Sequence, residues 1–335
     1  MYPSAGKKSV FVIALLVASL ILAAAVTYTQ VSSLGIHFLR VQQEKVHVQM
    51  MQGVAGNPWQ YRILADALMD PFLKLAKNAG WPQPESLTFI AFRFLQCLLI
   101  FTLAGVYYRR LGLLLYESLI GLSILAWSMS LSLYNSDLSF NVFFDIAFYL
   151  LAATLILNKA YWWTVLLMVP AALNRETCVL IPFAVFFAAR TTETDERQRR
   201  WGYIAAGTGL LLFAVISIGL RIYYAPQQFL TADGLYPGLG LFVLNLNRWI
   251  TWEQLAITLG IIPLLALFAY RAWPGPLKVF FWVIIPAWLA IHLFAALVAE
   301  TRLLLVPQAM VFIPGAVFGL AAARAPVAGA QDAAQ

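Results

Sequence analysis

The sequence predicts an all-α fold, a polytopic transmembrane helical bundle of about ten spanning helices with interfacial helices in the first outer loop. Hydrophobic residues make up 62% of the 335 residues, and the mean hydropathy is +0.79. Only 11% of the residues are charged, against roughly a quarter in soluble domains. The apolar runs are continuous rather than alternating, which excludes a β-barrel and requires helices in lipid, because only a helix satisfies its own backbone groups there.

The apolar runs define ten segments in chain order. They cover residues 9–28, 85–108, 111–133, 139–157, 161–173, 178–189, 201–222, 253–270, 279–299 and 303–323. The first run follows Lys7 and Lys8 and is longer than the roughly 7–15-residue apolar core of a signal peptide. We therefore interpret it as the first spanning helix. The fifth and sixth segments are short and are counted as two crossings.

The charge of the loops assigns the two sides of the membrane. If Lys7 and Lys8 lie in the cytoplasm, ten crossings place every short-loop basic cluster inside, as the positive-inside rule requires. These clusters are Arg109-Arg110, Lys159, residues 190–200, Arg271, Lys278 and Arg324. The predicted protein is a multi-pass cell-membrane protein with both termini in the cytoplasm. Residues 1–323 form a single transmembrane domain, and residues 324–335 form a disordered cytoplasmic tail.

Two long polar stretches, residues 29–84 and 223–252, then lie on the outer face. The first contains Asn57-Pro58 and Asp70-Pro71, and each pair is typical of a helix N-cap followed by proline at the first helical position. We predict two short helices over residues 58–69 and 71–79, lying in the plane of the membrane interface. Residues 37–51 fit either a helix or an alternating pattern.

Ionisable residues within spanning segments are costly and are candidates for function. Arg93 and Asp145 lie at similar depth in the second and fourth segments, which predicts a buried ion pair between them. Glu117 lies near the cytoplasmic end, and we expect a structural role for it. Asp137, Asn141 and Asp145 are spaced by four and share one helix face. They predict either a polar wall facing substrate or, for Asp137, a helix cap.

Two outer apices each combine an acid and a base. Arg175 and Glu176 form one, and Glu300 and Arg302 form the other. One interpretation is salt bridging between the two hairpins. The other is an arginine that binds a phosphate at the membrane surface, because a guanidinium forms paired hydrogen bonds with phosphate oxygens and stays charged.

Several function classes are not indicated. The sequence has no Gly-rich nucleotide loop, no Ser-His-Asp pattern and no HExxH motif. Its two cysteines lie inside apolar segments, and its three histidines lack metal-ligand spacing. A divalent metal remains open as a cofactor, with no clear ligand cluster. The net charge of +7 reflects the loops and does not indicate nucleic-acid binding.

This layout resembles the GT-C superfamily, the polytopic glycosyltransferases that use polyprenyl-phosphate-linked sugars. The resemblance rests on an inside N-terminus, a large first outer loop and two short motifs. The motifs are AALNRETCVLIP over residues 171–182 and ETRLLLVP over residues 300–307. The arrangement covers most of the chain.

The resemblance implies an inverting sugar transfer on the outer face, from a polyprenyl-phosphate-linked sugar to a lipid or glycan acceptor among the membrane lipids. It also implies a carboxylate in the first outer loop that acts as general base or binds a metal, and basic residues that hold the lipid phosphate. In this chain residues 29–43 contain no acidic residue. The candidate bases are therefore Glu44 and Asp66, and Asp137 ranks after them. The candidate substrate-binding residues are Arg62, Asn174, Arg175, Glu176, Glu300 and Arg302.

Two other classes remain as alternatives. A transporter or lipid flippase would be favoured by a polar pathway that reaches the cytoplasm through Glu117, although no internal repeat is visible in the sequence. A non-catalytic membrane assembly subunit would be favoured by an outer face without a cavity near Arg175 and Glu300.

Overall fold

The computed structural model describes residues 5–133, 137–228 and 234–324, and every regular element among them is helical. The longer helices are α1 (Ala5–Leu34), α4 (Leu64–Asn78), α5 (Pro84–Leu111), α6 (Leu115–Ser130), α7 (Phe140–Leu157), α8 (Tyr161–Asn174), α9 (Leu180–Thr192), α10 (Glu196–Tyr223), α14 (Gly275–Ala295) and α16 (Ile313–Arg324). The shorter helices are α2 (Ile36–Phe38), α3 (Glu44–Gln52), α11 (Leu239–Asn247), α12 (Trp249–Leu259), α13 (Ile262–Phe268) and α15 (Leu305–Pro307). The predicted all-α class is confirmed. A short turn is also predicted over residues 134–137; its residues 134–136, and residues 325–335 of the predicted tail, lie outside the described residues.

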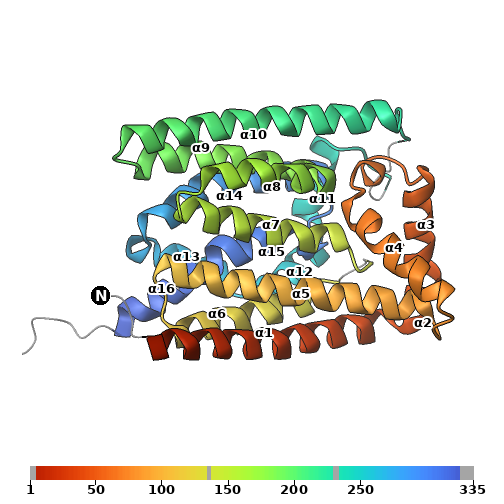
Figure 1. Ribbon diagram of the computed structural model, residues 1–335, viewed down its shortest axis with the longest axis horizontal. Coiled ribbons are helices and arrows are strands. Elements are labelled where there is room, and N and C mark those ends of the chain that lie inside the picture. The colour runs from red at the N-terminus through yellow and green to blue at the C-terminus, as the bar shows by residue number, and fades with distance from the viewer. Residues whose placement is uncertain (1–4, 134–136, 229–233, 325–335) are drawn as a thin grey trace, which may run out of the picture.

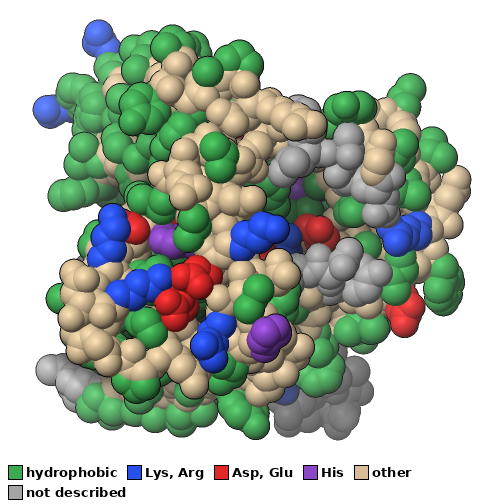
Figure 2. Space-filling view, turned by 90° about the vertical axis from the view of Figure 1, so that its right-hand side faces the viewer, with side chains coloured by type: hydrophobic (Ala, Val, Ile, Leu, Met, Phe, Trp, Pro, Cys, Tyr) green, Lys and Arg blue, Asp and Glu red, His purple; other side chains and the backbone are tan. Residues whose placement is uncertain are grey.

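The long helices form one bundle (Figure 1). Helices α1, α5, α7, α10 and α14 run alongside one another, and α2, α3 and α4 gather at the end away from the N-terminus. We call this the loop end; α1 begins and α16 ends at the opposite end. Helix α5 packs against α1 and α7, and α10 packs against α8 and α9. Seen from the loop end, acidic and basic side chains gather near the middle of the surface (Figure 2).

Six stretches of the described chain are long and apolar enough to span a membrane. They are Val10–Leu34, Pro84–Leu111, Phe140–Leu157, Glu196–Tyr223, Gly275–Ala295 and Thr301–Arg324. A seventh is added if α12 and α13 are counted as one bent span. Helices α6, α8 and α9, with 16, 14 and 13 residues, are shorter than the usual 17–25. The membrane class is confirmed, whereas length and composition support six or seven spans rather than about ten.

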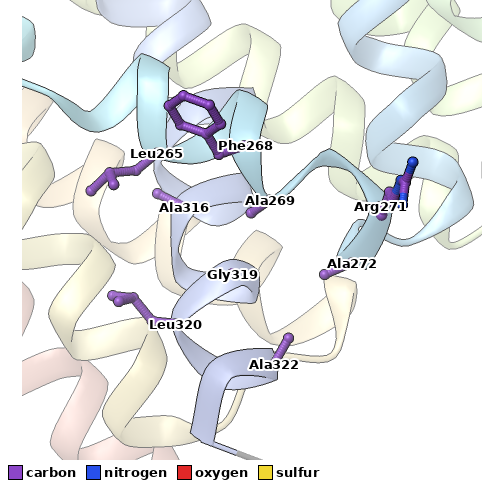
Figure 3. A pocket seen from close by; sticks show the side chains of 9 residues that line it. All are labelled: Leu265, Phe268, Ala269, Arg271, Ala272, Ala316, Gly319, Leu320 and Ala322. Atoms are coloured by element: carbon purple, nitrogen blue, oxygen red, sulfur yellow. The ribbon is translucent and has the colours of Figure 1, made fainter.

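The predicted segment over residues 253–270 is not one straight helix. Helices α12 and α13 meet at Gly260 with a bend of 69°. Gly260 has φ 58° and ψ −147°, a conformation that side chains with a Cβ rarely adopt, so glycine permits the break. Beyond the bend, α13 and α16 enclose an apolar groove of about 380 Å³ lined by Leu265, Phe268 and Leu320 (Figure 3). Arg271 also lines this groove, which lies away from the loop end.

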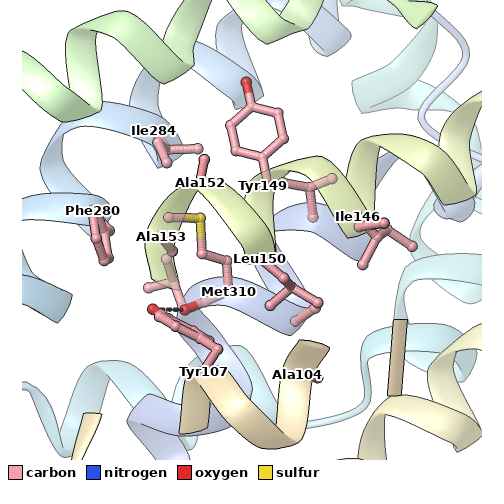
Figure 4. Close-up of a cluster of buried hydrophobic side chains, with 14 of the residues drawn as sticks. Ala104, Tyr107, Ile146, Tyr149, Leu150, Ala152, Ala153, Phe280, Ile284 and Met310 are labelled. Atoms are coloured by element: carbon pink, nitrogen blue, oxygen red, sulfur yellow. Dashed lines mark hydrogen bonds between the residues drawn. The ribbon is translucent and has the colours of Figure 1, made fainter. Parts of the chain in front are cut away.

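Two tyrosines of α5 form hydrogen bonds with the backbone of the last span, Thr301–Arg324. Tyr107 and Tyr108 are fully buried. The hydroxyl of Tyr107 donates to the carbonyl oxygen of Met310 (Figure 4), and that of Tyr108 donates to the carbonyl oxygen of Ala309, at 2.9 Å each. Both carbonyls belong to a π-helical turn, Gln308–Phe312, where the regular hydrogen-bond pattern is interrupted. The two tyrosines therefore satisfy acceptors that lipid could not.

Helices α8 and α9 form an antiparallel hairpin. Glu193, just after α9, accepts hydrogen bonds from Lys159 and Tyr161, just before and at the start of α8, at 2.6 Å each. The start of α8 and the end of α9 therefore lie side by side at the same end of the hairpin. The apex between the two helices holds Arg175 and the 3-10 turn Glu176–Val179. The predicted separation into two short helices is confirmed, with boundaries within a few residues of those expected.

Residues 58–79 contain one α-helix, where we predicted two. Trp59–Tyr61 is a 3-10 turn, and α4 then runs without a break through Pro71. Pro71 is exposed, so the carbonyl that it leaves unpaired can meet solvent, while buried Ala65, Met69 and Leu73 keep the helix seated on the bundle. Residues 37–51 fitted either a helix or an alternating pattern, and the structure shows that residues 36–52 are helical with a π turn at Leu39–Gln43.

The packing of α9 against α10 yields a first stability prediction. A Cβ on Gly202 of α10 would lie 2.3 Å from the Cβ of Ala189, which has no flexible end to move aside. We expect Gly202→Ala to destabilise the protein by about 1–3 kcal/mol, measured as thermal unfolding in detergent. Gly207→Ala in the same helix has nothing within 4 Å of the new Cβ and should be neutral or slightly stabilising. Equal melting temperatures of the two variants would contradict the close approach of Gly202 to Ala189.

Candidate functional site

The ionised residues of the loop end come from four parts of the chain. They lie on α3 and α4, at the start of α7, at the α8–α9 apex, and between α14 and α15. The ion pairs described below link these parts in space, so the fold brings together groups that are far apart in sequence.

Arg302 is at the centre of one cluster and is only 4% exposed. Its Nη1 lies 3.1 Å from Oδ1 of Asp137, and its Nη2 lies 2.8 Å from Oε2 of Glu300. Asp137 also accepts a hydrogen bond from Ser139. Burial raises the pKa of the Glu300 carboxyl above its ordinary value, and the charge of Arg302 offsets part of that effect.

Arg175 is at the centre of a second, fully buried cluster. Its Nη1 lies 3.2 Å from Oδ2 of Asp145 on α7. Asn174 and Thr177 donate to the same carboxylate at 2.8 and 3.0 Å. His292 of α14 donates through Nδ1 to the carbonyl oxygen of Trp288, so its Nε2 is the acceptor facing Arg175 Nη2 at 3.4 Å.

The predicted Arg93–Asp145 ion pair is wrong. Asp145 is bonded to Arg175 and the two neighbouring apex side chains instead. Arg93 stacks on the ring of Phe143, with 3.5 Å between the guanidinium carbon and the ring centroid. Equal depth in the membrane did not determine which way each side chain points around its helix. The expectation for Glu117 is confirmed, because its carboxylate accepts from the backbone N–H of Leu114 at the start of α6.

A third contact joins the first polar stretch to the hairpin apex. Arg62 donates from Nε to Oε2 of Glu176 at 3.0 Å, and its Nη2 lies 2.9 Å from the same oxygen. Burial opposes ionisation of Glu176, but the nearby Arg62 and Arg175 and a backbone hydrogen bond outweigh it, so its pKa lies below the ordinary value. The two predicted apices are thus not bridged to one another; each has partners elsewhere.

Asp66 and Asp70 of α4 both approach His47, whereas Glu44 of α3 pairs with a lysine. His47 is 2% exposed, and its Nδ1 lies 2.8 Å from Oδ1 of Asp66. Burial raises the pKa of Asp66, while the contact with His47 acts in the opposite direction. Asp70, predicted as a helix cap, lies within α4 and forms an ion pair with Lys74 at 2.7 Å. Glu44 pairs with Lys77 at 2.7 Å.

Two adjoining hollows open among these groups. The larger is a cleft of about 690 Å³, with Asp137, Glu300 and Arg302 on its polar side. Its other walls are mostly apolar: Leu34, Phe38, Val46, Trp59 and Leu133. A small cavity of about 20 Å³ lies beside it and is lined in part by Arg62, Asp66 and Asn141. Val46, Trp59 and Asp137 line both.

The structure therefore brings together only part of the predicted site. Asp137, Glu300 and Arg302 share the cleft, and Arg62 and Asp66 lie in the cavity beside it. Asn174, Arg175 and Glu176 form the adjacent hairpin apex and line neither hollow. Glu44 also lines neither.

Sequence reasoning missed the role of His47, the contact of His292 with Arg175, and one aromatic wall. His47 and His292 each contact a predicted site residue, and Trp59 lines both hollows. The one signal for His47 is the spacing of Asp66 and Asp70, which share a helix face and can both approach one partner. The sequence does mark His292, because it is an ionisable residue within the apolar segment over residues 279–299, but it does not show that Arg175 is its neighbour.

Among the described residues, no group of three or more histidine, cysteine or carboxylate side chains has the arrangement to hold a metal ion. Comparison of the chain with protein-family models, with curated proteins and with solved structures gives no match.

Proposed function

We propose that this protein is a membrane glycosyltransferase that moves a sugar from a polyprenyl-phosphate donor to an acceptor on the outer face of the cytoplasmic membrane. The observation that supports this most is the cleft at the loop end. It combines apolar walls suited to an isoprenoid chain with one buried arginine and two carboxylates on a single side. The resemblance of residues 171–182 and 300–307 to GT-C motifs points the same way.

The cleft suggests a role for each of its polar groups. Arg302 would hold the phosphate through paired hydrogen bonds, with the isoprenoid chain against Leu34 and Phe38. In the transfer, the acceptor hydroxyl attacks the anomeric carbon, and the bond from that carbon to the phosphate oxygen breaks. The polyprenyl phosphate leaves with the electron pair, and the hydroxyl proton passes to a carboxylate. We assign that base to Asp137, which lines both hollows, and place Asp66 second.

The proposal includes ten crossings with both termini inside. It counts α6, α8, α9 and the bent pair α12–α13 as crossings in addition to the six long spans. Support comes from the α8–α9 hairpin, whose ends meet at Lys159 and Glu193, and from the predicted inside position of the short-loop basic clusters. The loop end would then face outward, where the donor lipid is presented.

Sidedness can be tested with three single cysteines. Thr191→Cys and Gly275→Cys should react with a membrane-impermeant maleimide only after the cells are opened, whereas Ala79→Cys should react in intact cells. All three positions are exposed, and the native Cys97 and Cys178 are buried. Labelling of residue 191 or residue 275 in intact cells would overturn the ten-crossing topology.

The function is tested by incubating the purified full chain in liposomes with polyprenyl-phosphate donors radiolabelled in the sugar. Membrane lipids and glycans serve as acceptors. We expect label in the acceptor together with release of free polyprenyl phosphate. Movement of the labelled lipid between leaflets without transfer would overturn the proposal and favour a flippase. The structure offers that alternative little support, since Glu117 is bound to the end of its own helix.

A further inference from the structure

Arg93 is a buried cation without an acceptor. Its side chain is fully buried, and Nε, Nη1 and Nη2 have no hydrogen-bond partner among the described residues. Its guanidinium lies over the rings of Phe143 and Phe140, with 3.5 and 5.1 Å to the ring centroids. Aromatic faces attract a cation but accept no N–H hydrogen bond of ordinary strength, so they offset only part of the loss of hydration.

The surroundings of Arg93 connect it to the cleft. Arg93 lies within electrostatic range of Asp137 and Arg302, which both line the cleft. Phe140, one of its two stacking partners, lines the small cavity beside the cleft. Arg93 therefore lies near the polar side of the cleft without lining it.

The hydrogen-bonding groups in this region are unbalanced. Besides the three nitrogens of Arg93, Nε of Arg302 is buried without an acceptor. Nearly all buried donors in proteins are paired, and guanidinium groups can only donate. The group that would balance two neighbouring arginines is therefore an anion with several acceptor oxygens, and phosphate has that chemistry.

We propose that Arg93 is an anion-binding residue that, together with Arg302, holds a phosphate group entering through the cleft. This rests on the proposed function in taking the phosphate to be that of the polyprenyl donor. The cavity of about 20 Å³ must widen to admit the group.

The test is the Arg93→Met variant of the full chain in detergent, which keeps the length of the side chain and removes the charge. Because the cation is unpaired without ligand, we expect the ligand-free melting temperature to rise by about 2–4 °C. We expect the affinity for farnesyl phosphate to fall by about tenfold to a hundredfold, as lost hydrogen bonds to a charged group require. Arg110→Met, exposed at the far end of the same helix, should change neither quantity.

Three probes distinguish the sources of phosphate. Farnesyl phosphate, inorganic phosphate and phosphatidylglycerol are compared by thermal shift and by binding isotherm on the wild type and both variants. Weakened binding of farnesyl phosphate and inorganic phosphate, with phosphatidylglycerol unchanged, supports a site for a terminal phosphate. Equal weakening of all three probes also supports the anion site but assigns it to lipid headgroups in general.

Two results overturn the inference. One is unchanged farnesyl phosphate affinity in Arg93→Met. The other is a ligand-free melting temperature of Arg93→Met below that of the wild type, which would show that Arg93 stabilises the ligand-free fold. Neither depends on sugar transfer. If the wild type binds phosphate through Arg93 and yet transfers no sugar from any donor, the proposed function is wrong, whereas the anion site at Arg93 is supported.

Discussion

Arg302→Met is expected to lower the rate of sugar transfer by about a hundredfold to a thousandfold, the range seen when a group that stabilises developing charge is removed. Arg302 is the one cation lining the cleft among the described residues, and it holds Asp137 and Glu300 in place. The loss should appear mainly in kcat, because the charge on the departing phosphate grows as the sugar is transferred.

Arg302→Lys separates charge from geometry in this prediction. Lysine keeps the cation but cannot form two parallel hydrogen bonds with phosphate, so its activity should fall between those of the wild type and Arg302→Met. Arg40→Met removes an exposed arginine from the first polar stretch, residues 29–84, and should leave the rate of sugar transfer unchanged. Thermal unfolding of each variant shows whether it is folded. A folded Arg302→Met variant with wild-type activity would exclude Arg302 from the site.

The second large effect is on stability. Arg175→Met is expected to lower the free energy of unfolding by about 3–5 kcal/mol, because it leaves the carboxylate of Asp145 buried without its cation. Asn174 and Thr177 still donate to that carboxylate, but neither carries a charge. The measurement is equilibrium unfolding in mixed detergent micelles.

The double variant Arg175→Met with Asp145→Leu provides the decisive comparison. Replacing both members of a buried ion pair by apolar residues is often close to neutral, so most of the lost stability should return and the coupling energy should be large. Lys74→Met is the control, since it breaks an exposed pair with Asp70 that contributes at most about 1 kcal/mol. Additive effects of the two buried substitutions would show that Arg175 and Asp145 do not stabilise one another.

The sequence predicted what depends on composition and on short-range pattern. Apolar runs located the helices of the bundle, and the break between residues 174 and 178 located the apex of the α8–α9 hairpin. It failed where tertiary packing outweighs a local signal. Pro71 suggested a helix start, but the buried face of α4 continues through it, and Gly260 breaks a run that hydropathy alone joins.

The candidate site was predicted by residue type but not by pairing. Asp137 and Arg302 were both identified, yet nothing in the sequence shows that they lie 3.1 Å apart, since 165 positions separate them. The choice of Arg175 over Arg93 as the partner of Asp145 depends on how α7 is rotated toward the hairpin. Contacts between distant segments depend on the packing of whole helices, which hydropathy does not encode.

The cleft has a consequence for biosynthesis. Its walls come from residues 33–59 near the start of the chain and from residues 300–302 near its end. A nascent chain emerging from the ribosome cannot assemble this cleft until its final span follows into the bilayer. Chains that end before residue 300 would lack Arg302, and the Asp137 side of the cleft would form without that cation.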